Sequence, residues 1–95
     1  ITVETSTPLP VQSLYSLLAA MPPSVLRVKG IVNLVERPGL KCIVQATGQR
    51  AMLTIGEAWG TDASSSQLVI IGLRGWQANT APAWWDAFHR LMIRH

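Results

Sequence analysis

The chain has 95 residues, of which 48% are hydrophobic and 14% are charged, and its formal net charge is +3. This length corresponds to one domain with a core of its own, and the charged fraction is well below the roughly 25% of an average soluble domain. A single cysteine excludes an intrachain disulfide and agrees with a reducing compartment. No apolar run approaches the ~18 residues of a membrane span, so we expect a cytoplasmic protein without a membrane partner.

The low charged fraction also bears on the surface, which should carry more apolar area than a free-standing monomer usually shows. A piece of a larger protein, with an interface laid bare, would explain this composition. The eight Lys and Arg residues are scattered along the chain, whereas nucleic-acid-binding domains concentrate basic residues in a stripe. On charge alone we therefore do not expect a nucleic-acid partner.

The first third of the chain predicts a strand and a helix. Residues 1–5 alternate between apolar and polar and indicate a short strand. Thr7 followed by Pro8 is typical of a helix N-cap and first turn, and apolar residues then recur at helical spacing as far as Met21. Pro22 and Pro23 end this helix, because proline removes a backbone donor and clashes with the preceding turn.

Three strands joined by short turns follow. Residues 25–35 predict a long strand with Leu26, Val28, Val32 and Leu34 on one face. A turn at residues 38–39 leads to a strand over residues 40–47, and Gly48 with Gln49 predicts a type II′ hairpin turn with positive φ at Gly48. A two-residue loop pairs residue 47 with 50, and the register then places residues 46, 44 and 42 opposite 51, 53 and 55.

The last part of the chain predicts a loop, a strand and a helix. Residues 56–66 form a polar loop interrupted by Trp59. Residues 67–73 form an almost wholly apolar strand, which is either a central strand covered on both faces or a strand beside a tight interface. Asn79 or Thr80 caps a final helix, whose apolar side carries Trp84 or Trp85, Phe88, Leu91 and Met92. The order β-α-β-β-β-β-α predicts an α+β fold, with a mostly antiparallel sheet of four to five strands and two helices on one face.

Four segments occur in the order of a known family. They are Leu26-Arg27-Val28-Lys29-Gly30, Gly48-Gln49-Arg50, Trp59 and Leu68-Val69-Ile70-Ile71-Gly72. The ordered set, over roughly residues 1 to 75, resembles the C-terminal domain of the CobW family of GTP-dependent metal-trafficking proteins. That domain typically reads leucine-arginine-x-lysine-glycine, glycine-x-arginine, tryptophan and leucine-valine-phenylalanine-isoleucine-glycine. After Leu73 the chain departs from the family, because no acidic residue precedes the last helix.

The resemblance implies that residues 1–95 are an accessory domain of a larger protein, whose GTPase domain is not in this chain. It implies GTP and zinc or cobalt for the parent protein and no cofactor for this domain. The parent would deliver metal to enzymes or serve cobalamin synthesis. The implied partners are the parent's own N-terminal GTPase domain and a metalloenzyme client.

Residues with catalytic or metal-binding chemistry are few and dispersed. Cys42, His89 and His95 do not have the spacing of a metal site, and no phosphate-binding loop occurs. The acidic residues stand apart, mostly next to turns, so we expect no carboxylate pair for acid–base catalysis. The sequence thus predicts no catalytic, cofactor-binding or metal-binding residue and no enzyme activity. We expect Gly30, Gly48 and Gly72 to serve the fold rather than a ligand.

The second face of the central strands offers a candidate docking surface. Strand alternation and the hairpin register bring cations and aliphatic side chains to the same side. The candidate residues are Arg27, Lys29, Ile31, Asn33, Ile43, Arg50 and Met52. This mixture is typical of a protein interface, and a plain solvated strand face is the alternative.

Two other functions stay open at this point. One is a free-standing, ferredoxin-like module that binds a protein or RNA. The residues expected on the candidate surface include no aromatic side chain for base stacking, which argues against RNA. The other is an independent small enzyme, for which the chain offers no candidate residue.

Overall fold

The computed structural model describes residues 1–48, 50–79 and 82–93. The strands are β1 (Thr2–Thr5), β2 (Val25–Asn33), β3 (Leu40–Thr47), β4 (Arg50–Ala58) and β5 (Ser66–Gly72), and the helices are α1 (Val11–Ala19), α2 (Trp76–Asn79) and α3 (Pro82–Ile93). The strands form a sheet in the order β1-β5-β2-β3-β4, and every neighbouring pair is antiparallel. The predicted α+β class and element order are confirmed, with α2 as a short additional helix before α3.

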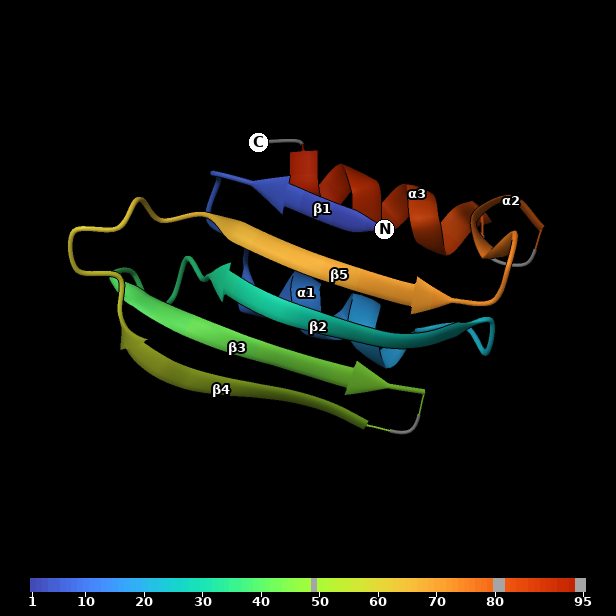
Figure 1. The fold of residues 1–95 in the computed structure, drawn as a ribbon, viewed down its shortest axis with the longest axis horizontal. Coiled ribbons are helices and arrows are strands. Elements are labelled where there is room, and N and C mark those ends of the chain that lie inside the picture. Colours follow the sequence, from blue (N-terminus) through green and yellow to red (C-terminus); the bar gives the residue numbers. More distant parts are fainter. Residues whose placement is uncertain (49, 80–81, 94–95) are drawn as a thin grey trace.

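The two longer helices lie on one side of the sheet. Figure 1 shows α1 behind the middle of the sheet and α3 beside β1, and α1 and α3 also contact each other. Their apolar side chains pack on alternate residues of the central strands. The core residues include Leu14, Leu18, Val28, Val32, Val44, Leu68, Ile70, Phe88 and Met92. The indole Nε1 of Trp84 donates a hydrogen bond to the carbonyl oxygen of Leu17 at 2.8 Å, which joins the helices.

Helix α1 begins later than the sequence predicts. Its N-cap is Pro10, not Thr7, and no side chain of the cap residue bonds the first turn. The preceding residues are held in extended form, because Leu9 donates its N–H to the carbonyl of Asn33 and accepts from the N–H of Val35, both at 2.9 Å. A carboxylate oxygen of Glu36 accepts the N–H of Val11 at 3.0 Å, so a residue distant in sequence satisfies the helix start.

Strand β2 contains a register shift between Val25 and Arg27 in its pairing with β5. Val25 is buried, Leu26 is 48% exposed, and strict alternation resumes at Val28. The prediction that Leu26 shares a face with Val28 and Val32 is therefore wrong. An extra residue in one strand of a pair reverses the alternation on one side of it, and apolar patterning alone does not reveal such a bulge.

The β3–β4 hairpin has the predicted register. The pairs are Thr47 with Arg50, Ala46 with Ala51, Val44 with Leu53 and Cys42 with Ile55. The described glycines with positive φ are Gly30, Gly39, Gly60 and Gly75, so the positive φ predicted for Gly48 is wrong. The second turn residue, 49, lies outside the described residues. Strand β5 pairs with both β1 and β2, so it is an inner strand as predicted. The prediction that both of its faces are covered is wrong, because Ile71 is 44% exposed on the side away from the helices.

Strand β4 runs further than the sequence predicts, to Ala58, and a second register shift follows the Cys42–Ile55 pair. The prediction that Ser66 belongs to the loop is also wrong, because Ser66 is the first residue of β5. It is fully buried, and its hydroxyl accepts the N–H of Asn33 at 2.8 Å. At the other end, residue 80 of the proposed helix cap lies outside the described residues, and Asn79 ends α2. The buried Phe88 and Met92 confirm the predicted apolar side of α3.

Candidate docking surface

The face of the sheet opposite the helices, called the open face below, gathers the predicted docking residues in rows across the strands. Arg27 pairs with Thr47, which pairs with Arg50. Lys29 pairs with Gln45, which pairs with Met52. Ile31 pairs directly with Ile43. Because paired residues of an antiparallel sheet share a face, the structure brings six of the seven candidate residues together.

Asn33 is the exception among the candidates. It ends β2 and is only 8% exposed, so its side chain adds nothing to the exposed surface, contrary to the prediction. The backbone N–H of Asn33 donates to the Ser66 hydroxyl, and its carbonyl oxygen accepts from the N–H of Leu9. These two hydrogen bonds hold the end of β2 between β5 and the segment before α1. Its side-chain oxygen is buried and has no hydrogen-bond partner.

The aliphatic residues of the open face remain substantially exposed. Ile31 is 40% exposed, Ile43 38% and Met52 49%. Ile71 on β5 pairs with Arg27 and is 44% exposed, so it extends the apolar part of the surface. The sequence pattern of β5, apolar at nearly every position, did not distinguish Ile71 from its buried neighbour Ile70. Single exposed aliphatics are common, but a contiguous group marks a contact surface.

A groove of about 560 Å³ lies on this face. Its walls include Arg27, Lys29, Ile31, Lys41, Ile43 and Trp59. Two isoleucines from neighbouring strands lie among three cations and one aromatic ring. Grooves that bind protein segments typically combine apolar anchors with a few polar or charged groups of this kind.

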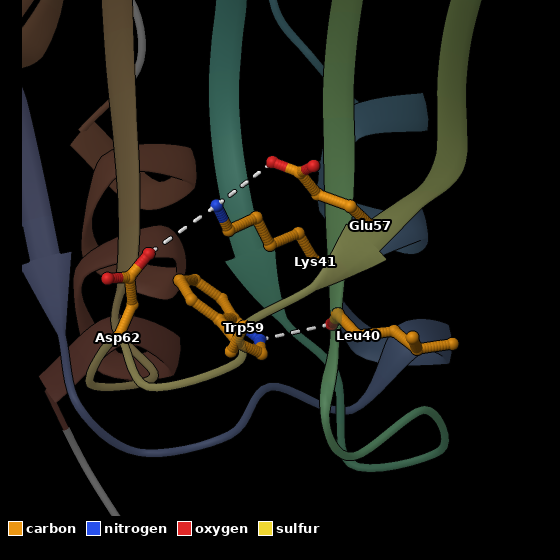
Figure 2. Close-up of polar contacts among 5 residues, drawn as sticks. All are labelled: Leu40, Lys41, Glu57, Trp59 and Asp62. Atoms are coloured by element: carbon orange, nitrogen blue, oxygen red, sulfur yellow. Dashed lines mark hydrogen bonds and ion pairs between the residues drawn. The ribbon is translucent and has the colours of Figure 1, made fainter.

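Lys41 and Trp59 both line the groove, and Figure 2 shows them with the groups that they contact. The indole Nε1 of Trp59 donates to the carbonyl oxygen of Leu40 at 3.1 Å, and the Lys41 ammonium lies 5.6 Å from the ring centroid. Lys41 also forms ion pairs with Glu57 at 3.5 Å and with Asp62 at 3.9 Å. The bulge in β4 helps to place Glu57 beside Lys41, because the register there accommodates an extra residue.

Trp59 belongs to this surface although the sequence pattern does not predict it there. The tryptophan lies in a loop after β4, and its position depends on contacts with residues some twenty positions away. Strand alternation from Ile43 does place Lys41 on the open face. The presence of Trp59 corrects the expectation that this face has no aromatic side chain.

The two ends of the open face differ in charge. Lys41 is balanced by two carboxylates. In the described part of the chain, Arg27, Lys29 and Arg50 form no ion pair. Positive charge is therefore unbalanced at the Arg27 and Lys29 end, and the apolar centre lies between the two ends.

The reactive residues that the sequence singled out are not grouped. Cys42 is fully buried, and burial raises the pKa of its thiol, partly opposed by a hydrogen bond from the backbone of Thr54. His89 lies against the ring of Trp85, with ring centroids 5.4 Å apart. His95 is outside the described residues. Among the residues described, no three His, Cys, Asp or Glu side chains are close enough to hold a metal, and no helix is long and apolar enough to cross a membrane.

The chain is thus an α+β domain in which one face of a five-stranded antiparallel sheet is covered by helices and the other is exposed. The family described as "Cobalamin synthesis protein cobW C-terminal domain" matches residues 1–89, and the chain belongs to this family. No curated protein sequence matches the chain.

Two solved structures share the fold. The Zn(II)-bound YjiA GTPase from E. coli has a TM-score of 0.71 at 20% sequence identity. A Zn(II)-bound triple mutant of YjiA has a TM-score of 0.72 at 21% identity. Each comparison covers 96% of this chain and 28% of the other, so the chain corresponds to a little over a quarter of these GTPases in length.

Proposed function

We propose that this domain is a non-catalytic regulatory and interaction module of a CobW-like, GTP-dependent metallochaperone. In this proposal the domain docks through its open face and thereby controls GTP hydrolysis or metal release by the parent protein. The parent would deliver zinc or cobalt to enzymes or serve cobalamin synthesis in the cytoplasm. Family membership and the likeness to Zn(II)-bound GTPases support the setting.

The observation that carries the proposal is the open face itself. Ile31 and Ile43 are adjacent, each is about two-fifths exposed, and the unpaired cations Arg27 and Lys29 lie beside them. A solvated strand face would carry polar side chains at these central positions, whereas a face that contacts another domain is apolar at its centre and charged at its rim.

The test is a double substitution, Lys29→Glu with Ile43→Asp, in the full-length protein that carries this domain. It places carboxylates at the centre and the rim of the surface and leaves the helix-covered core untouched. We expect a change of about fivefold or more in GTP hydrolysis or metal transfer, which corresponds to ~1 kcal/mol of lost docking free energy. Circular dichroism and the denaturation midpoint check that the fold survives.

A matched control changes the net charge by the same amount on the opposite side. Gln12→Glu with Arg90→Glu alters exposed residues of α1 and α3 and should leave both activities unchanged. If the open-face variant folds and behaves like this control, the face is merely solvated and the proposal is wrong.

RNA binding by the same face is a second candidate, because the groove contains Trp59 beside cations. A base would have to stack on the indole, and the Lys41 ammonium already lies over that ring. The docking proposal is therefore preferred.

A further inference from the structure

We infer that the occupant of the open-face groove is an acidic segment from another part of the same polypeptide. One aliphatic side chain of that segment lies over Ile31 and Ile43, and a carboxylate of the segment lies beside Lys29 or Arg27. The inference rests on the proposed function, since it names the partner of that docking surface.

The anchor position follows from the strand register. Ile31 and Ile43 are directly paired across neighbouring strands, which lie roughly 5 Å apart, so one branched aliphatic side chain can contact both. On β4, Thr54 pairs with Ile43 and Gly56 lies diagonally from it, where an added Cβ would meet the Cδ1 of Ile43 at 3.4 Å. The absence of a side chain at Gly56 leaves this flank of Ile43 uncovered.

The charge of the occupant follows from the difference between the lysines. Lys41 already has the carboxylates of Glu57 and Asp62 within 4.0 Å, so an incoming acidic group gains little there. Lys29 and Arg27 lie on the same face without an ion pair in the described ranges. A carboxylate is thus favoured at only one end of the groove, which also fixes the direction in which the segment lies.

Strand geometry sets the spacing between anchor and acid. Residues two apart on a strand are separated by roughly 7 Å, so Lys29 and Arg27 lie roughly 7 and 13 Å from Ile31 along β2. An extended segment meets this spacing when its acidic residue is two to four positions from its aliphatic residue. This is the pattern to seek in the rest of the polypeptide.

The strength of the contact favours a tethered partner over a separate one. Burying the exposed two-fifths of each isoleucine raises the binding constant by about fivefold, and each rim ion pair adds about fivefold or less. These gains are small beside the translational and rotational freedom that a separate partner loses on binding. A segment of the same polypeptide avoids most of that loss, because the tether gives it a high effective concentration at the groove.

Zero-length carbodiimide cross-linking of the purified full-length protein, followed by peptide mapping, tests the inference. We expect Lys29 to join a carboxylate outside residues 1–95 of the same chain. The yield should fall at least fivefold in the Ile43→Asp variant and in 1 M salt. Lys41 is the internal control, because it should join Glu57 or Asp62 in every sample. Mixing ¹⁵N-labelled and unlabelled protein separates links within a chain from links between copies.

Three results would overturn the inference. In the first, Lys41 reacts but Lys29 joins no distant carboxylate. In the second, Lys29 joins a carboxylate only between labelled and unlabelled copies, and in the third a poly-uridine oligonucleotide binds the wild type but not the Lys29→Glu variant. The proposed function fails separately, when the open-face double variant retains normal activity. If that variant is impaired but Lys29 joins no distant carboxylate, docking stands and the acidic partner does not.

Discussion

The two faces of the β2–β3 pair differ sharply although they are made from alternate residues of the same strands. On the covered face, Val28 and Val44 are fully buried under the helices. On the open face, Lys29, Ile31 and Ile43 remain exposed. The covered face supplies buried apolar surface to the core, and the open face is the surface that we propose for docking. Neighbouring residues of one strand can therefore be changed to test stability and docking separately.

The largest effect is expected on the covered side. Phe88 is fully buried and contacts Trp84, with ring centroids 5.2 Å apart. Phe88→Ala should lower the free energy of unfolding by about 3–5 kcal/mol, since it removes buried apolar surface and leaves a cavity. Ile43→Ala on the open face should cost about 1 kcal/mol or less. Urea denaturation of both variants measures the difference, and equal losses would show that the open face also belongs to the core.

A glycine at the centre of the sheet should give the next largest effect. Gly30 has φ 156°, and an added Cβ would overlap the backbone carbonyl oxygen of Gln67 on the neighbouring strand. Gly30→Ala should destabilise by roughly 2 kcal/mol or more, because the backbone of β5 must move. Gly48→Ala is the control: a Cβ there meets nothing within 4 Å, and the change should stay within about 0.5 kcal/mol. A well-tolerated alanine at Gly30 would contradict the tight β2–β5 approach.

Cys42 distinguishes the faces chemically. Its thiol is on the covered side, and burial raises its pKa. Iodoacetamide should therefore modify it only after unfolding. Because the thiol ionises more readily in the unfolded state, its contribution to stability is complete below the ordinary thiol pKa and falls as pH rises above it. Cys42→Ala should show a shallower loss of stability between neutral and alkaline pH. Rapid alkylation of the native protein would mean that the sheet opens locally.

The smallest effect is expected at the Lys41 end of the open face, where the charges are balanced. Glu57 and Asp62 are largely exposed, so their ion pairs with Lys41 are screened by water. Lys41→Met should change stability by less than about 1 kcal/mol. It should nevertheless alter the fluorescence of Trp59, since it removes the cation beside the indole. Lys29→Met lacks such a contact and serves as the control. A large loss of stability would show that the contacts of Lys41 hold the loop after β4 in place.

The sequence predicted most of the fold and most of the candidate surface. Ile31, Ile43 and Met52 were placed correctly because the hairpin loop sets the β3–β4 register and alternation is strict between bulges. The predicted positions of Leu26 and Asn33 were wrong for local reasons. A register shift in β2 exposes Leu26, and hydrogen bonds from Asn33 to the Ser66 hydroxyl and from Leu9 to Asn33 hold the end of β2 in the interior.

The sequence by itself determined the element order, the hairpin register and the division of the central strands into two faces. These features depend on short-range quantities, namely the period of two along a strand and the length of a turn. Only the tertiary structure decided where α1 starts, where the bulges lie, and that Trp59 and Lys41 both line the groove. Each of these depends on a contact between residues far apart in the chain, such as Glu36 with Val11 or Trp59 with Leu40. Short-range patterns carry no information on such contacts until the strands are paired.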